Sequence, residues 1–261
     1  MPDIPASDRG AAIVTGGRRG IGAAIAAALA RAGFSVAICD LIRDAAAERT
    51  LDSIAAAGGK TLFLTADIAD TDCHQSIIEQ TSAAFGPITC LVNNAGTQVS
   101  VRGDMLAAPI ADFDRVIGVN LRGTFFLTQA VGRHMAEAPK TAAPRSVIVI
   151  SSANAHMVSP EKAIYCLSKS ALSMLSKLYA ARLAEFGIDV FEIQPGLIKT
   201  DMNAAVHDSY GAAIEAGMSL TRRWGLPEDV AAVAAALATG QLPFITGTTL
   251  PVGGGLHVHR L

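Results

Sequence analysis

Short apolar runs alternate with longer alanine-rich segments along almost the whole chain. Several of these runs are apolar at successive positions rather than at alternate ones, a pattern typical of strands that helices cover on both faces. We therefore expect strands at 11–15, 35–39, 61–65, 88–92, 146–151, 188–193 and 248–252. The helical segments between them are expected to begin near Gly20, Asp44, Thr71, Asp112, Lys162 and Pro227.

The order of these segments predicts the fold class. Strand and helix alternate, and right-handed crossovers then give an α/β fold with a doubly wound parallel sheet of about seven strands and helices on both faces. Because no Pro/Ser-rich linker divides the chain, we expect residues 1–261 to form a single domain. Residues 200–226 interrupt the alternation, and a connection of that length is typical of a lid over a substrate.

Composition narrows the class of partner. The chain is 51% hydrophobic and only 17% charged, which indicates a compact fold with a large core. A formal net charge of -2 gives no electrostatic reason to expect nucleic acid or an anionic membrane as partner. Polar residues interrupt every apolar segment before ~20 positions, so no membrane span is expected. We predict a small-molecule substrate.

The cysteines and the first residues bear on metal binding and compartment. Cys39, Cys73, Cys90 and Cys166 lack the paired spacing of a zinc site, and the histidines show only a weak HVH pattern, so we expect no metal. The cysteines fit reduced thiols in a cytoplasmic protein. The start MPDIPASDRG lacks a basic residue run followed by an apolar stretch, so no signal peptide is expected.

A glycine-rich stretch, TGGRRGIG at 15–22, joins the first expected strand to the first expected helix. Glycines there let the backbone turn tightly and approach a pyrophosphate, whose charge the N–H groups of the helix N-terminus stabilise. A plain strand-to-helix turn would also explain the glycines taken alone.

Four further motifs occur later in the chain: CLVNNAG at 90–96, VNLRGTFF at 119–126, ISSANAHMVSPEKAIYCLSK at 150–169 and QPGLIKT at 194–200. Together with the glycine stretch they resemble the classical short-chain dehydrogenase/reductase family over about residues 11–254. The resemblance implies a Rossmann-like fold and an enzyme acting on CH–OH donors with NAD(P) as acceptor. Such an enzyme interconverts a secondary alcohol and its carbonyl by hydride transfer.

The family's catalytic group is matched by Asn120, Ser152, Tyr165 and Lys169. Tyr165 and Lys169 are four residues apart, so both lie on one helix face, where an ammonium favours the phenolate. Tyr165 then acts as general base in alcohol oxidation and as general acid in carbonyl reduction. The resemblance implies that Ser152 binds the substrate oxygen, that Lys169 holds the nicotinamide ribose, and that Asn120 positions a water for proton relay. A lone Y-x-x-x-K would also fit an ordinary amphipathic helix.

Two residues give opposite indications about the dinucleotide. Asp40 ends the second strand, where a carboxylate accepts hydrogen bonds from the adenosine ribose and repels a 2′-phosphate. Arg19 stands where NADP-dependent relatives place a basic residue. Because a surface arginine can turn toward solvent, we predict NAD as cofactor with some use of NADP. Asp40 also fits a cap of the next helix, a role that Asp44 can fill.

The resemblance extends the expected cofactor site to the ends of several strands. Asp67 is expected to meet the adenine amino group, and Ile198 and Thr200 the nicotinamide carboxamide. The full set of expected cofactor contacts is Thr15, Gly16, Arg18, Arg19, Gly20, Ile21, Gly22, Asp40, Leu41, Ala66, Asp67, Ile68, Asn93, Ala95, Gly96, Tyr165, Lys169, Pro195, Gly196, Ile198 and Thr200.

Substrate contacts are expected from the catalytic segment and from the lid. In the segment they are Ser152, Asn154, His156 and Tyr165, although a structural role explains His156 equally well. The lid offers polar residues for a hydroxylated or anionic substrate: His207, Asp208, Ser209, Tyr210, Arg222 and Arg223. Alternatively, one of the two arginines pairs with Glu228 or Asp229 at the start of the next helix.

The predicted function is NAD(H)-dependent interconversion of a secondary alcohol, such as a sugar, polyol or hydroxy compound, and its carbonyl. The alternative is an NADPH-dependent carbonyl reductase similar to 3-oxoacyl-carrier-protein reductases, but Glu185 and Phe186 stand where those enzymes carry a cation. A non-enzymatic dinucleotide-sensing protein is a further alternative. Segments 120–137 and 163–187 are apolar on more than one face, which with the family's habit predicts a homotetramer.

Overall fold

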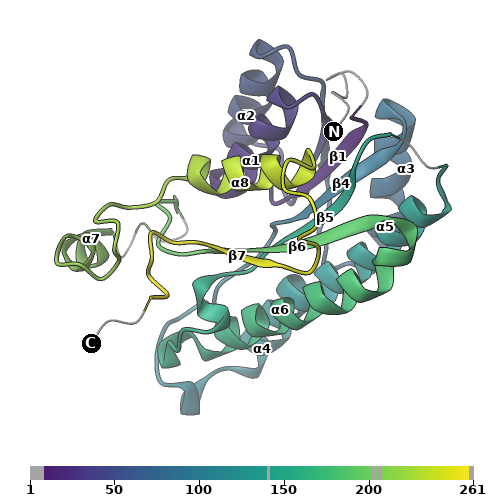
Figure 1. Cartoon of the computed structure of the whole chain (residues 1–261). Coiled ribbons are helices and arrows are strands. Elements are labelled where there is room, and N and C mark those ends of the chain that lie inside the picture. The colour runs from purple at the N-terminus through teal and green to yellow at the C-terminus, as the bar shows by residue number, and fades with distance from the viewer. Residues whose placement is uncertain (1–8, 140–141, 202–203, 205–206, 259–261) are drawn as a thin grey trace.

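The computed structural model describes residues 9–139, 142–201, 204 and 207–258 and is built around one parallel sheet (Figure 1). The strand order is β3-β2-β1-β4-β5-β6-β7. The strands are β1 (Ala11–Thr15), β2 (Ser35–Asp40), β3 (Thr61–Thr65), β4 (Ile88–Asn93), β5 (Arg145–Ile150), β6 (Ile188–Pro195) and β7 (Thr249–Val252). Each neighbouring pair is parallel, so the predicted doubly wound α/β sheet is confirmed.

Helices cover both faces of the sheet, which explains why β1, β4 and β5 are buried at every position. One face carries α1 (Gly20–Arg31), α2 (Ala45–Ala56) and α8 (Pro227–Ala238), packed on one hydrophobic core cluster. The other carries α3 (His74–Phe85), α5 (Thr124–Glu137) and α6 (Ala163–Leu183), packed on the second. Within the described ranges, no helix is long and apolar enough to cross a membrane.

Most expected helix starts agree with the structure to within a few residues. Asp44 caps α2, because its carboxylate accepts hydrogen bonds from the N–H groups of Ala46 and Ala47 at 3.0 and 3.1 Å. The helix expected near Asp112 begins earlier, as α4 (Ile110–Ile117), and continues into α5 through a π-helical segment, Gly118–Gly123. A π-segment widens the helix by one residue per turn and is frequent at functional sites.

From β1 the successive strands β2 and β3 are added toward one edge of the sheet, whereas from β4 the strands β5 to β7 are added toward the other edge. The connection after β1 leads to α1 on one face, whereas the segment after β4 leads to α5 on the other. The two connections therefore diverge and leave a crevice beyond the carboxyl ends of these strands. This is where an α/β sheet of this kind binds its ligand.

The expected lid contains a further helix, α7 (His207–Glu215), which stands apart from the sheet (Figure 1). Of the lid residues singled out from the sequence, the side chain of Ser209 lies outside the described part. Arg223 forms an ion pair with Asp229 at 2.7 Å, so the alternative pairing at the start of α8 is confirmed for this arginine.

Candidate active site

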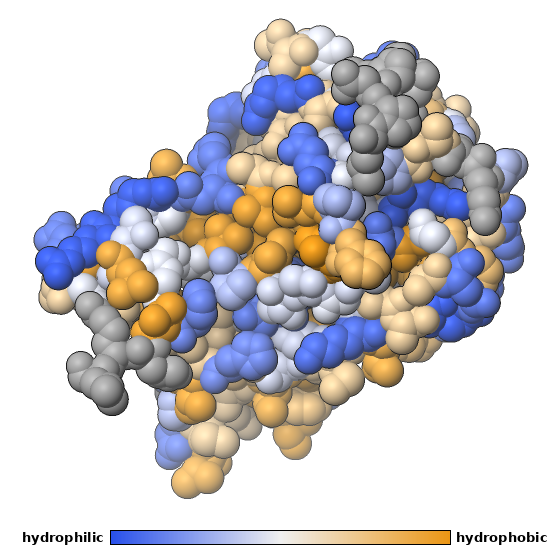
Figure 2. All heavy atoms as spheres, viewed as in Figure 1, coloured by the Kyte–Doolittle hydropathy of each residue, from blue (hydrophilic) through white to orange (hydrophobic). Residues whose placement is uncertain are grey.

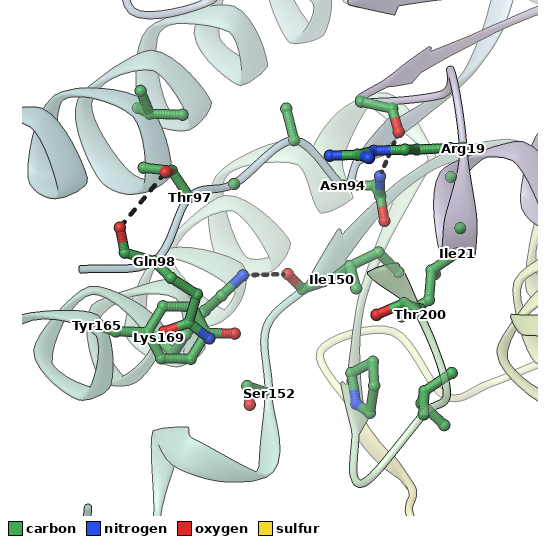
Figure 3. A pocket seen from close by; sticks show the side chains of 18 of the residues that line it. Arg19, Ile21, Asn94, Thr97, Gln98, Ile150, Ser152, Tyr165, Lys169 and Thr200 are labelled. Atoms are coloured by element: carbon green, nitrogen blue, oxygen red, sulfur yellow. Dashed lines mark hydrogen bonds between the residues drawn. The ribbon is translucent and has the colours of Figure 1, made fainter. Parts of the chain in front are cut away.

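A cleft of about 540 Å³ lies at the carboxyl ends of the central strands. Figure 3 shows side chains from three segments converging on this cleft: the glycine-rich stretch at 15–22, called the glycine loop below, the segment after β4, and α6. It brings together most of the residues singled out from the sequence. Those lining it are Gly16, Arg18, Arg19, Gly20, Ile21, Gly22, Asp40, Leu41, Ala66, Asp67, Ile68, Ala95, Gly96, Ser152, Asn154, Tyr165, Lys169, Pro195, Gly196, Ile198 and Thr200. The expected residues Thr15, Asn93, Asn120 and His156 are not among them.

The glycine loop forms a cradle whose shape depends on missing side chains. A Cβ on Gly22 would lie 2.1 Å from the carbonyl oxygen of Gly16, and Gly16 itself has a φ of +64°. Arg19, the N-cap residue of α1, makes no side-chain capping hydrogen bond. The N–H groups of the first turn of α1 are therefore available to an anion, and the residues present fit a dinucleotide pyrophosphate.

Thr15 and Asn93 do not line the cleft and instead form hydrogen bonds behind it. The hydroxyl of Thr15 accepts hydrogen bonds from the N–H groups of Asn94 and Ala95, both at 3.0 Å. Asn93 is buried, and its amide donates to the hydroxyl of Thr128 at 2.8 Å. It is Asn94 that lines the cleft, with its amide donating to the carbonyls of Thr15 and Gly16. Asn93 is the last residue of β4 and Asn94 follows it, and the contact expected between Asn93 and the cofactor stays a prediction.

The corner of the cleft beside β2 carries excess negative charge. Asp40 accepts hydrogen bonds from the backbone N–H groups of Arg18 at 3.1 Å and Leu41 at 2.8 Å. The guanidinium of Arg18 forms an ion pair with Asp44 and lies 3.7 Å from the Asp40 carboxylate. One cation therefore faces two carboxylates. Arg19 forms its ion pair with Asp201, at 3.2 Å, instead of with either of them.

Ser152, Tyr165 and Lys169 meet at the opposite end of the cleft (Figure 3). Tyr165 and Lys169 project from one face of α6, and the Lys169 ammonium lies 5.6 Å from the centre of the Tyr165 ring. That ammonium donates to the carbonyl of Ile150 at 3.0 Å. The end of β5 therefore fixes the lysine against the tyrosine, and the expected constellation is present.

Burial controls the ionisation of this group. It raises the pKa of Tyr165 to about 12, and the hydrogen bond with Ser152 acts in the opposite direction. Burial also lowers the pKa of Lys169 to about 8. The expectation that a neighbouring ammonium brings the phenol within reach of ionisation at neutral pH is not met, because desolvation of the phenolate is the largest influence on the pKa of Tyr165. At neutral pH Tyr165 is protonated and equipped to donate.

Asn120 lies in the π-helical segment and is completely buried. Its side-chain oxygen accepts from the N–H of Thr97 at 2.7 Å, and its amide donates to the Thr97 carbonyl and the Ser168 hydroxyl, both at 3.0 Å. Asn120 therefore joins the segment after β4 to α6 from behind the cleft. It does not line the cleft, and its role in a proton relay stays a prediction.

His156 is exposed and does not line the cleft, so its contact with the substrate stays a prediction. Asn154 lines the cleft, and its amide donates to the carbonyl of Met157 at 3.0 Å. From the lid, Tyr210 reaches the cleft as well.

Sequence reasoning missed Glu192, a carboxylate that is only 1% exposed inside β6. Four donors surround it: the hydroxyls of Ser151, Ser173 and Thr249, and the amide of Gln194. Its charge raises the pKa of Lys169 against the effect of burial. A charged residue within an apolar strand was the available signal, since a buried carboxylate is retained only where donors or cations stabilise it.

Comparisons with known proteins agree with this geometry. The family profile described as enoyl-(acyl carrier protein) reductase matches residues 16–257. The crystal structure of 3-oxoacyl-[acyl-carrier protein] reductase from Brucella melitensis in complex with NAD is 45% identical, with a TM-score of 0.93, and the match covers 97% of this chain and 99% of that one.

Two curated relatives have names from different substrate classes. The 3beta-hydroxysteroid dehydrogenase 1 of Eggerthella lenta is 34% identical over 95% of this chain and 93% of its own length. Glucose 1-dehydrogenase 2 of Bacillus subtilis is 32% identical over 95% of both chains. With the parallel sheet, the glycine cradle and the converging Ser152, Tyr165 and Lys169, these matches show that the chain belongs to the short-chain dehydrogenase/reductase family of NAD(P)-binding oxidoreductases.

Proposed function

We propose that this protein is an NAD(H)-dependent oxidoreductase that interconverts a secondary alcohol and its carbonyl, with Tyr165 as general acid and base. The observation that carries the proposal is the placement of Ser152, Tyr165 and Lys169 at one end of a cleft whose other end holds the glycine cradle and Asp40. A dinucleotide lying along the cleft would place its reactive ring beside Tyr165 and its adenosine beside Asp40.

In the reducing direction, Ser152 and Tyr165 donate hydrogen bonds to the substrate carbonyl, and Tyr165 transfers its proton as negative charge develops on that oxygen. When bound, a nicotinamide would supply or accept the hydride. In the oxidising direction the Lys169 ammonium favours the phenolate, which takes the proton of the alcohol. Glu192 supports the charged form of Lys169.

The preference for NAD rests on the charge around Asp40. A 2′-phosphate would enter a corner in which Arg18 already faces the carboxylates of Asp40 and Asp44. The next residue, Leu41, is 59% exposed and offers no cation to an added phosphate. Repulsion between poorly solvated like charges costs several kcal/mol, whereas an exposed pair with Arg19 is worth roughly 1 kcal/mol or less.

A second candidate is 3-oxoacyl-carrier-protein reduction, because the Brucella melitensis structure of that name is 45% identical to this chain. At the end of α6, however, Arg182 forms an ion pair with Glu185 and lies against the ring of Phe186. This arrangement leaves that end of the helix with little net charge for an acidic carrier protein. A dinucleotide-sensing protein without activity would not need Tyr165 and Lys169 together.

The proposed activity is tested with a panel of sugars, polyols, hydroxy acids and ketones, each offered with NAD(H) and NADP(H). We expect a change in absorbance at the reduced-nicotinamide band with at least one alcohol and its ketone, because both directions use the same proton donor. Tight NAD binding without turnover of any compound would contradict the enzyme and favour the sensing protein.

We also propose that the protein is a homotetramer, since two separate surfaces are apolar. Between α5 and α6 there is a groove of about 610 Å³, and Leu167, Met174 and Leu178 are exposed along α6. Figure 2 shows a second gathering of apolar side chains over α8 and the β7 edge. Two such surfaces allow two different twofold contacts and hence four copies.

The proposed tetramer is tested by light scattering, which should give a mass about four times the 26.9 kDa chain mass. A mass equal to that of the monomer would contradict the proposal.

We further propose that residues 1–261 work as one domain in the cytoplasm. Cys39, Cys73, Cys90 and Cys166 are all free thiols, which fits a reducing compartment. Cys39 and Cys90 are buried in the sheet, and burial raises the pKa of each thiol to about 12. Neither is therefore a reactive thiolate at neutral pH.

A further inference from the structure

A second lysine lies as close to the Tyr165 ring as the catalytic one. Lys162 precedes α6 by one residue and lines the cleft, with its ammonium 5.7 Å from the centre of the Tyr165 ring. Whereas Lys169 is bound to the carbonyl of Ile150, the side chain of Lys162 makes no hydrogen bond or ion pair with any residue that the structure describes. Within the described residues, its ammonium therefore faces the cleft beside the Tyr165 ring with no carboxylate bound to it.

Arg102 adds a second cation to the same wall. It follows β4 in the chain, lines the cleft, and lies 3.6 Å from the carboxylate of Glu161. Both cations line the same cleft; burial and the charge of Arg102 lower the pKa of Lys162, and the charges of Cys166 and Glu161 raise it. Arg115, the other arginine nearby, is already bound by Asp112 at 2.8 Å.

The charges at this wall do not cancel. Two cations, Lys162 and Arg102, face one carboxylate, Glu161, whose side chain is 50% exposed. About one positive charge is left beside Tyr165. An unpaired ammonium in a partly dry cleft is costly, and an anionic ligand would remove that cost. A single excess charge matches a carboxylate better than a doubly charged phosphate.

We propose that Lys162 and Arg102 form an anion subsite and that the substrate carries a carboxylate close to its reacting carbonyl or alcohol carbon. The subsite rests on the proposed function, because Tyr165 must act on that carbon. It narrows the substrate from secondary alcohols in general to hydroxy acids and oxo acids.

The test compares acids with their neutral esters in NADH-dependent reduction. The probes are 2-oxopentanoate, 3-oxopentanoate and 4-oxopentanoate, each paired with its methyl ester. The oxopentanoyl group is then the same within each pair, and the negative charge is present only in the acid. We expect one acid to exceed its ester in kcat/KM by at least about tenfold, since a charge-assisted hydrogen bond contributes this much or more.

Lys162→Gln is expected to lower that acid-to-ester ratio by about 10- to 100-fold, and Lys162→Arg to restore most of it. Arg102→Gln should lower the ratio as well, and it provides a second variant should Lys162→Gln fold poorly. The matched control is Lys60→Gln, because Lys60 is exposed before β3 and does not line the cleft. That control should leave the ratio unchanged.

The outcomes separate the two claims. Reduction of the esters with no preference for any acid, or an acid preference that neither Lys162→Gln nor Arg102→Gln changes, would overturn the subsite and leave the proposed activity standing. If none of the six compounds is reduced and the wider panel of alcohols and ketones is inactive too, both claims are overturned.

Discussion

Replacing Tyr165 with phenylalanine is expected to abolish turnover, lowering kcat by about 10²- to 10⁴-fold. The substitution removes the hydroxyl that exchanges a proton with the substrate oxygen and leaves the buried ring in place. Because the glycine cradle and Asp40 lie at the other end of the cleft, the affinity for the dinucleotide should change little. The measurement is steady-state turnover, with NADH fluorescence titration as the check on binding.

The matched control is Tyr179→Phe on the same helix. The Tyr179 hydroxyl donates to the carbonyl of Phe125 at 2.8 Å, and this side chain lies outside the cleft. The control should lose some stability and keep its turnover. If Tyr165→Phe retained more than a few per cent of the wild-type rate, Tyr165 could not be the general acid.

Asp40→Ser is expected to reduce the preference for NAD over NADP, measured as a ratio of kcat/KM, by about 100-fold or more. The substitution removes one of the two carboxylates that face Arg18, so a 2′-phosphate would meet a freed guanidinium in place of a negative charge. It also removes the acceptor for the ribose hydroxyls, and NAD affinity should fall at the same time.

An exposed acid on α2 provides the control for this prediction. Asp52 lies outside the cleft, so Asp52→Ser changes the net charge of the chain equally without altering the site. Its dinucleotide preference should equal that of the wild type. A wild-type protein that prefers NADP, or an Asp40→Ser variant with an unchanged ratio, would refute the role given to Asp40.

The fold could be predicted because its signals are local. Runs such as 11–15 and 88–92 are apolar at nearly every position, and burial on both faces of the sheet imposes that pattern. The π-helical segment Gly118–Gly123 could not be predicted, because its sequence does not differ visibly from that of an ordinary helix. The junction of α4 and α5 depends instead on contacts of Asn120 with Thr97 and Ser168.

The candidate site likewise has some features that could be predicted from the sequence and others that could not. The glycine cradle and the Tyr165–Lys169 pair are encoded in short stretches, so both are visible in the sequence. Residues that are close in space but distant in the sequence are not visible: Glu192 in β6 raises the pKa of Lys169, and Arg102 lines the same cleft as Lys162, sixty positions later. Asn93 is the last residue of β4 and Asn94 follows the strand, and only Asn94 lines the cleft, a difference that two adjacent asparagines in a sequence do not reveal.

Transfer of label from the dinucleotide tests the central claim most directly. The wild-type protein is incubated with a ketone from the panel and NADH that carries deuterium at both C4 positions of the nicotinamide ring. We predict an alcohol with one deuterium on the carbinol carbon, formed in step with the loss of reduced-nicotinamide absorbance. NADH binding with no labelled alcohol from any ketone, sugar or oxo acid in the panel would contradict the account.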